Sequence, residues 1–147
     1  MVTTSSATDV DLAARLRLAV IRTARRLRQE AGTDLSPSLT AALATIERHG
    51  PLSPSGLAEI ERVRRPTATR MVARLEEEGL VLRTTDPADG RVSVVTISAA
   101  GRTLLKRIRG RKNAYLARRL RELSTDEVAD LERAAAILER LLEEERA

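Results

Sequence analysis

The chain has 147 residues, which is enough for one domain with its own hydrophobic core. It contains no cysteine and a single histidine, so disulfides and thiol chemistry are excluded and a transition-metal site is disfavoured. Its 26 Lys and Arg outnumber its 21 Asp and Glu, and the net charge of +5 favours an anionic partner.

The positive charge is concentrated in the middle of the chain. Residues 1–60 have a net charge of +1, residues 61–111 of +6, and residues 112–147 of −2. A basic excess confined to one segment is typical of a nucleic-acid-binding surface. The chain has one Tyr and neither Phe nor Trp, which disfavours single strands, because proteins bind these by stacking bases on aromatic rings. These features favour double-stranded DNA as the partner.

Other functional classes find little support in the residues. No apolar run approaches the ~20 residues of a membrane span and no signal peptide is visible, so we expect a cytoplasmic protein with no membrane partner. Glutamate runs occur at 76–78 and 143–145, both at the ends of predicted helices. No glycine-rich phosphate loop, nucleophile motif or metal-ligand spacing accompanies them. We therefore expect no catalysis, no cofactor and no metal.

The first predicted element is a helix from about Asp9 to Ala31, in which apolar residues recur at helical spacing. Two more helices begin at Ser36-Pro37 and Ser53-Pro54, because Ser caps the free amides of a first turn and Pro fits there without losing a hydrogen bond. Capping explains Ser36 and Ser53, and contact with DNA phosphates would be an additional role. The candidate phosphate contacts at these starts are Ser36, Ser38, Ser53 and Ser55.

A turn at 62–65 leads into a helix over about 66–78. Two helices joined by a tight turn, with Arg and hydroxyl residues at the start of the second, are the pattern of a helix-turn-helix. An Arg can bind O6 and N7 of guanine, and a Thr can contact phosphate or a thymine methyl. The alternative is a solvated face on which Arg74 pairs with Glu77 or Glu78. The candidate DNA contacts are Arg64, Arg65, Thr67, Thr69, Arg70 and Arg74.

Two runs rich in β-branched residues, at about 80–85 and 91–97, flank a turn-forming segment and predict a β-hairpin. Arg91 lies near its tip, where a guanidinium suits the negative potential of a minor groove. Asp89 is expected to pair with Arg91 or to cap the turn. For Arg83 the sequence leaves phosphate binding and bracing of the hairpin equally open. The candidate hairpin residues are Arg83, Asp89, Gly90 and Arg91.

A long helix from Ser98 to about Leu123 and a last helix after the capping box at 124–127 complete the chain. Apolar residues in the last helix alternate spacings of three and four, a period typical of a seam against other helices. Because an isolated helix pair would leave this surface in water, pairing with a second copy is predicted. The candidate dimerisation residues are Leu12, Leu16, Leu116, Leu120, Val128, Leu131, Leu138 and Leu142.

Two stretches of the chain resemble the MarR family of winged-helix regulators: LTAALATIERHGPLSPSGLAEIERVRRPTATRMVARLEEEGLV and RTTDPADGRVSVVTISAAG. The wing signature, Asp-x-Arg followed by β-branched residues, Ser/Thr and Gly, is specific at this distance from a recognition helix. The resemblance implies a triangular homodimer whose two heads enter successive major grooves of a near-palindromic operator. It also implies a repressor released by a small anionic or phenolic effector bound between the dimerisation and DNA-binding parts.

The chain departs from the family pattern at two positions. Arg64 stands where many relatives have a Ser before the recognition helix, so water or a DNA phosphate would have to satisfy the first amides. Gly90 stands in the middle of the wing triplet, where an Arg is common. The wing therefore has one charge fewer and a weaker expected grip on the minor groove.

The sequence thus predicts an α+β fold, mostly α, with a winged helix-turn-helix and a dimerisation region made of the N- and C-terminal helices. The expected parts, in one compact domain, are an N-terminal dimerisation helix (1–34), a DNA-binding region (35–98) and C-terminal dimerisation helices (99–147). The predicted function is a DNA-binding transcriptional regulator, a homodimeric repressor with an effector. The alternative is a dimeric winged-helix protein-interaction module without specific DNA binding.

Overall fold

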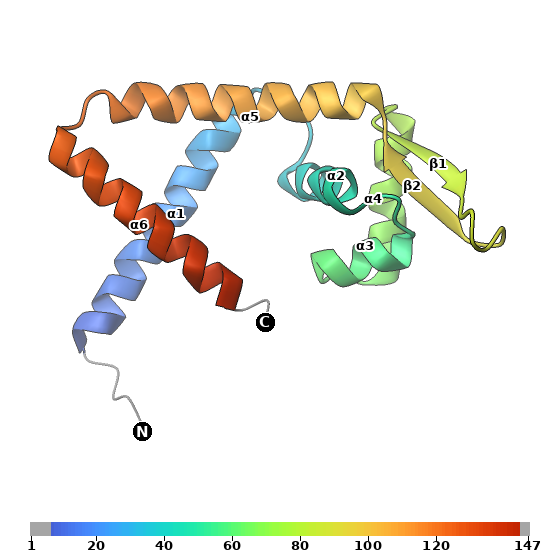
Figure 1. Ribbon diagram of the computed structural model, residues 1–147, viewed down its shortest axis with the longest axis horizontal. Helices are drawn as coiled ribbons and strands as arrows, with labels where there is room; N and C mark the ends of the chain where they lie inside the picture. The colour runs from blue at the N-terminus through green and yellow to red at the C-terminus, as the bar shows by residue number, and fades with distance from the viewer. Residues whose placement is uncertain (1–6, 145–147) are drawn as a thin grey trace.

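The computed structural model describes residues 7–144, which form six helices and one two-stranded sheet (Figure 1). In chain order these are α1 (Ala7–Ala31), α2 (Pro37–His49), α3 (Pro54–Glu61), α4 (Arg65–Glu77), β1 (Val81–Thr85), β2 (Ser93–Ile97), α5 (Ala99–Leu120) and α6 (Thr125–Glu144). The predicted class, α+β and mostly α, is confirmed. Residues 1–6 and 145–147, which include the end of the second glutamate run, lie outside this description. Within it, no helix is both long and apolar enough to cross a membrane.

The helix starts follow from local capping. The Ser36 and Ser53 hydroxyls accept hydrogen bonds from backbone amides three residues later, at 3.2 and 3.1 Å, as the sequence predicts. The predicted capping box of α6 is also confirmed, since Ser124 and Glu127 accept hydrogen bonds from each other's backbone amides at 3.1 and 3.0 Å. These contacts set the helix starts independently of distant packing.

One helix boundary differs from the sequence prediction. α5 ends at Leu120 rather than near Leu123, because the amides of residues 122 and 123 donate to carbonyls only three residues back. The chain therefore turns toward α6 one helical turn earlier than expected.

The hydrophobic core lies in the head, which comprises α2, α3, α4 and the β1–β2 hairpin. The strands are antiparallel, with Val81 opposite Ile97 and Thr85 opposite Ser93. Leu52 adds a short bridge to β2. α5 also contributes to this core, through Leu105 in its first half. The largest fully buried side chains of the core are Leu43, Ile46, Leu57, Val72, Leu75, Val81, Val95 and Leu105.

Ser98 joins α5 to the corner between α4 and β1. Its hydroxyl donates to the Gly79 carbonyl (2.6 Å) and accepts from the Gly101 amide (3.0 Å), while its own amide donates to the Leu80 carbonyl (3.0 Å). Ser98 is buried, so these bonds are shielded from water. A Cβ on Gly101 would lie 2.3 Å from the Leu80 carbonyl oxygen, which shows how closely α5 approaches this corner.

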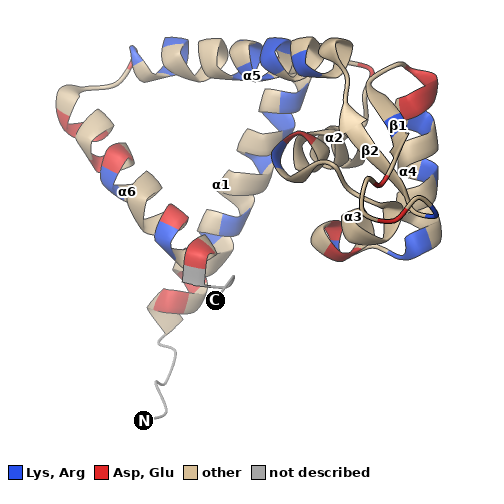
Figure 2. Cartoon of the chain, turned by 45° about the vertical axis from the view of Figure 1, so that its right-hand side comes forward, with Lys and Arg blue, Asp and Glu red and all other residues tan. Residues whose placement is uncertain are grey.

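The frame, which comprises α1, α5 and α6, outlines a triangle beside the head (Figures 1 and 2). α5 leaves the head as one straight helix, and α6 returns from its far end toward the N-terminal half of α1. Arg111 of α5 donates to the carbonyl of Ala31 (3.1 Å) and so caps the end of α1. Nearby, the Arg26 guanidinium lies 5.4 Å from the centre of the Tyr115 ring, a cation–π contact between α1 and α5.

The frame leaves many large apolar side chains in water. No described residue of α6 is buried, and Leu142 is 64% exposed. A monomer usually exposes single, scattered apolar residues, whereas the frame exposes many along α1 and α6. The exposed large apolar residues of the frame are Val10, Leu12, Leu16, Leu18, Val20, Ile21, Leu120, Leu131, Ile137, Leu141 and Leu142.

Candidate nucleic-acid interface

α4 follows α3 through a tight turn and presents one polar face to solvent. Its apolar face buries Ala68, Val72 and Leu75 against the head, as the 3.6-residue period requires. The opposite side is rich in cations and hydroxyls. The exposed candidate DNA contacts are Arg64, Arg65, Thr69, Arg70 and Arg74, and Thr67 is half-buried.

The start of α4 has no side-chain cap. Arg64 is the N-cap residue and makes no capping hydrogen bond, as its side chain leads one to expect. The Thr69 hydroxyl donates to the Arg65 carbonyl (3.0 Å), so its methyl group and its oxygen lone pairs remain for a partner. The free amides and neighbouring cations of this first turn form a surface suited to a phosphate.

Arg70 and Arg74 differ in what they contact. Arg74 pairs with Glu78 at 2.9 Å and approaches Glu77 at 3.9 Å, which is the ion-paired arrangement that the sequence left as the alternative. The Arg70 side chain is exposed and makes no hydrogen bond or ion pair to any described residue. An exposed ion pair contributes at most about 1 kcal/mol. Arg70 is therefore free to bind a partner, whereas Arg74 must first leave its glutamates.

The hairpin tip is ordered by short hydrogen bonds. The Asp86 amide donates to the Val92 carbonyl (2.8 Å), and the Val92 amide donates to the Asp89 carbonyl (3.0 Å). Asp89 fulfils both of its expected roles, because its carboxylate accepts from the backbone amide (3.1 Å) and from Nε (3.2 Å) of Arg91. The Arg91 side chain is nevertheless 92% exposed. Arg91 is thus oriented by the turn and projects into solvent.

Gly90 has no steric need to be glycine. Its φ lies outside the left-handed region, and a Cβ there would meet only the Thr85 methyl carbon, at 4.0 Å. The tip therefore has room for a side chain between Asp89 and Arg91.

Arg83 connects the hairpin to α4. Its Nε donates to a Glu76 carboxylate oxygen (3.1 Å), and its Nη1 donates to the Ser93 hydroxyl (3.2 Å). Of the two roles that the sequence leaves open, bracing of the hairpin has geometric support.

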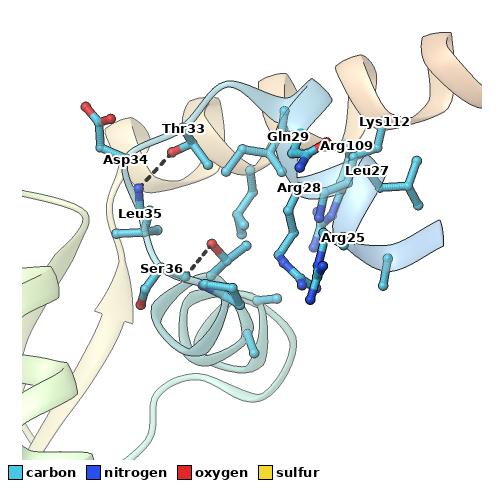
Figure 3. A pocket seen from close by; sticks show the side chains of 18 residues that line it. Arg25, Leu27, Arg28, Gln29, Thr33, Asp34, Leu35, Ser36, Arg109 and Lys112 are labelled. Atoms are coloured by element: carbon cyan, nitrogen blue, oxygen red, sulfur yellow. Dashed lines mark hydrogen bonds between the residues drawn. The ribbon is translucent and has the colours of Figure 1, made fainter. Parts of the chain in front are cut away.

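The four candidate serines do not share one surface. Ser36 lies at the rim of a cavity between α1, α2 and α5, and its hydroxyl is engaged in capping (Figure 3). Ser53 caps the start of α3, and Ser55 is exposed in the first turn of the same helix. Ser38 is exposed near the start of α2.

The sequence did not identify the residues of this cavity, although the family resemblance implied an effector site between the dimerisation and DNA-binding parts. The cavity has a volume of about 720 Å³, and aliphatic side chains make much of its wall. Arg25 and Arg28 extend into it from α1, and Arg109 and Lys112 line it from α5 (Figure 3). Arg109 also pairs with Glu47 of α2 at 2.8 Å. The arginines of α1 were the available signal, but their proximity to α5 depends on the tertiary fold.

Basic and acidic residues gather on different elements. Figure 2 shows Lys and Arg on α1, on α4 and along α5, whereas α6 carries many Asp and Glu. Among the candidate dimerisation residues, Leu12, Leu16, Leu120, Leu131 and Leu142 are exposed, and Leu116, Val128 and Leu138 are half-buried.

Comparison with known proteins agrees with this arrangement. Residues 35–93 match the model of the MarR family. The chain is 39% identical over 137 residues to the HTH-type transcriptional regulator ML2140 of Mycobacterium leprae, covering 92% of this chain and 96% of that protein. It is 30% identical over 94 residues to the HTH-type transcriptional repressor MdtR of Bacillus subtilis, covering 64% of this chain and 61% of that protein.

The fold is also shared with solved structures. A crystal structure of a Pseudomonas aeruginosa protein superposes with a TM-score of 0.85 at 35% identity, covering 93% of this chain and 97% of that one. Sequence and fold therefore agree over nearly the whole chain, and the chain belongs to the MarR family of winged-helix transcriptional regulators.

Proposed function

We propose that this regulator is a homodimeric repressor that binds a near-palindromic operator in double-stranded DNA. The observation that carries the proposal is the presence of two exposed cations on one head: Arg70 on α4, whose side chain has no ion-pair partner among the described residues, and Arg91 at the hairpin tip, which is oriented by Asp89 and is 92% exposed. The recognition helix would enter a major groove and set sequence. The wing would place Arg91 in the neighbouring minor groove. The name of MdtR, a repressor, supports the direction of regulation.

The remaining candidates take supporting roles in this proposal. Arg64, Arg65, Thr67 and Thr69 would contact phosphates or base edges beside Arg70, and Arg74 would join them after leaving Glu78. The serines at the starts of α2 and α3 would add phosphate contacts. Phosphate contacts release counterions, so affinity would fall steeply with salt.

The dimer is proposed from the exposed apolar surface of the frame. A second copy would cover α6 and the N-terminal half of α1, which no described part of the same chain buries. The division into dimerisation helices (1–34 and 99–147) and a DNA-binding region (35–98) follows from this pairing.

The cavity is the proposed effector site. Its volume lies in the ordinary range for ligand pockets, and four cations beside an aliphatic wall suit an amphipathic carboxylate. We expect 2-naphthoate to bind more tightly than its uncharged analogue 2-naphthamide in a calorimetric titration. Equal binding of the two compounds, or binding of neither, would contradict an anionic effector.

The DNA proposal is tested by an electrophoretic shift assay with the DNA upstream of the coding region at rising salt. Specific binding that weakens steeply with salt is expected. The double variant R70A/R91A should lose this binding. If no specific fragment shifts and the double variant behaves as the wild type, DNA binding fails and a protein-interaction module becomes the better account.

A further inference from the structure

One guanidinium links the recognition helix to both strands of the wing. Arg83 of β1 contacts the Glu76 carboxylate at the end of α4 (3.1 Å) and the Ser93 hydroxyl at the start of β2 (3.2 Å). We call these three residues the wing brace. Among the described residues, Glu76–Arg83 is the one ion pair that joins α4 to the hairpin.

The register explains why Arg83 can reach α4. Side chains alternate along a strand, so Arg83 shares a face with Val81 and lies opposite Val95. Both valines are buried in the core. Arg83 therefore continues the core-facing side of the hairpin beyond the edge of the core, where its side chain reaches the end of α4.

Beyond Val81, β1 has few contacts of its own with the core, whereas β2 is held by the buried Val94, Val95 and Ile97 and by the Leu52 bridge. In β1 only Val81 is buried, and the four residues after it are exposed. An isolated two-stranded hairpin is marginally stable in water, so its angle to the head depends on the few contacts at its base. The planar guanidinium meets the carboxylate and the hydroxyl in fixed directions, which a lysine cannot do.

We propose that Arg83 is a positioning residue: the wing brace sets the angle between α4 and the wing, and through it the reach of Arg91. This inference rests on the proposed DNA-binding function. Arg83 does not bind phosphate in this account, because the carboxylate beside it repels a phosphate and two of its donors are engaged within the protein.

The two roles predict opposite signs for one substitution. If Arg83 binds phosphate, Glu76→Gln removes a repelling charge and tightens DNA binding. If Arg83 is a brace, Glu76→Gln releases the wing and weakens binding by about fivefold, the equivalent of one surface ion pair. Arg83→Lys keeps the charge, so the brace predicts a similar loss whereas a phosphate contact predicts near wild-type affinity.

Glu78→Gln is the matched control. It also removes one carboxylate from the end of α4, with 39% of the side chain exposed against 43% for Glu76, but its partner is Arg74 and not the wing. Affinity would be measured by fluorescence anisotropy with a labelled duplex that the protein selects from a random library. The brace predicts weaker binding for Glu76→Gln and unchanged or tighter binding for Glu78→Gln. Equal effects of the two variants would overturn it.

A double-mutant cycle separates positioning from general destabilisation. In the Arg91→Ala background, Glu76→Gln should cost little further affinity, because the brace acts through Arg91. Full additivity, or a lower melting temperature for Glu76→Gln than for Glu78→Gln, would assign a merely structural role and overturn the proposal. If the wild type selects no duplex, the DNA-binding function itself fails and the brace with it. If the wild type binds and the cycle is additive, only the brace fails.

Discussion

At the scale of single residues, the proposed binding of DNA depends on which cationic side chains are exposed to solvent in the folded chain. Arg70 and Arg91 both point into solvent, but Arg70 lies on a helix face and Arg91 on a turn. A guanidinium on a recognition helix can distinguish bases, whereas one in the minor groove responds mainly to negative potential. Their substitutions should therefore have different consequences.

Arg91→Ala should weaken binding on all sequences and reduce the salt slope by about one, because one cation is lost. Arg70→Ala should relax base preference at one position in each half-site, at about 1–3 kcal/mol against the wrong base. Competition binding with a library of single-base operator variants measures both effects. Identical losses on every operator for the two variants would contradict this division.

A substitution at Gly90 should strengthen the contact between the wing tip and DNA. Because the position has room for a side chain and an ordinary φ, Gly90→Arg should fold normally and add a cation beside Arg91. We expect tighter DNA binding and a salt slope steeper by about one. Gly90→Gln, similar in length but uncharged, is the control; an equal gain from both would rule out the charge as the cause.

At the scale of elements, the backbone of α5 passes close to the α4–β1 corner at Gly101. Gly101→Ala would place a methyl carbon 2.3 Å from the Leu80 carbonyl oxygen, so a shift of α5 and a loss of about 1–3 kcal/mol are expected. Gly110, in the same helix, has nothing within 4 Å of an added Cβ, and Gly110→Ala should stabilise by about 0.5–1 kcal/mol.

Urea unfolding of both variants at one protein concentration measures this contrast, since the stability of a dimer depends on concentration. Opposite signs are expected for the two glycines. Two stabilising substitutions would mean that α5 does not approach the α4–β1 corner as closely as the structure has it.

The helices and strands are also the part of the structure that the sequence predicts best. Ser36 and Ser53 start helices because capping is local, and two runs rich in β-branched residues on either side of a turn-forming segment predict the hairpin. The end of α5 was placed too late, because the turn that stops it carries no glycine or proline. The role of Arg83 stayed open, since the contact with Glu76 depends on how the hairpin packs against α4.

The residues that line the cavity could not be predicted from the sequence. Its cations come from α1 and α5, which are separated by residues 32–98, and no local pattern brings Arg25 close to Arg109. Ion pairing on α4, by contrast, follows from local spacing: Arg74 has glutamates three and four residues later, which is the alternative that the sequence offers, whereas Arg70 has none.

At the scale of the whole molecule, the exposed apolar surface of the frame makes self-association the main expectation. Leu131→Glu places a charge within the proposed dimer surface and should shift the protein toward monomer in analytical ultracentrifugation. Leu82→Glu changes another exposed leucine, on the wing (56% exposed against 47% for Leu131), and should leave the dimer intact. Equal sedimentation of both variants would show that α6 is not part of the dimer contact.

The central claim is that two heads hold one operator, each through a recognition helix and a wing. Hydroxyl-radical footprinting of the selected duplex tests it most directly. We expect two equivalent protected patches related by a twofold axis, centred about 10 base pairs or a multiple of that apart on one side of the DNA. A single protected patch, or uniform protection without a repeat, would contradict the account.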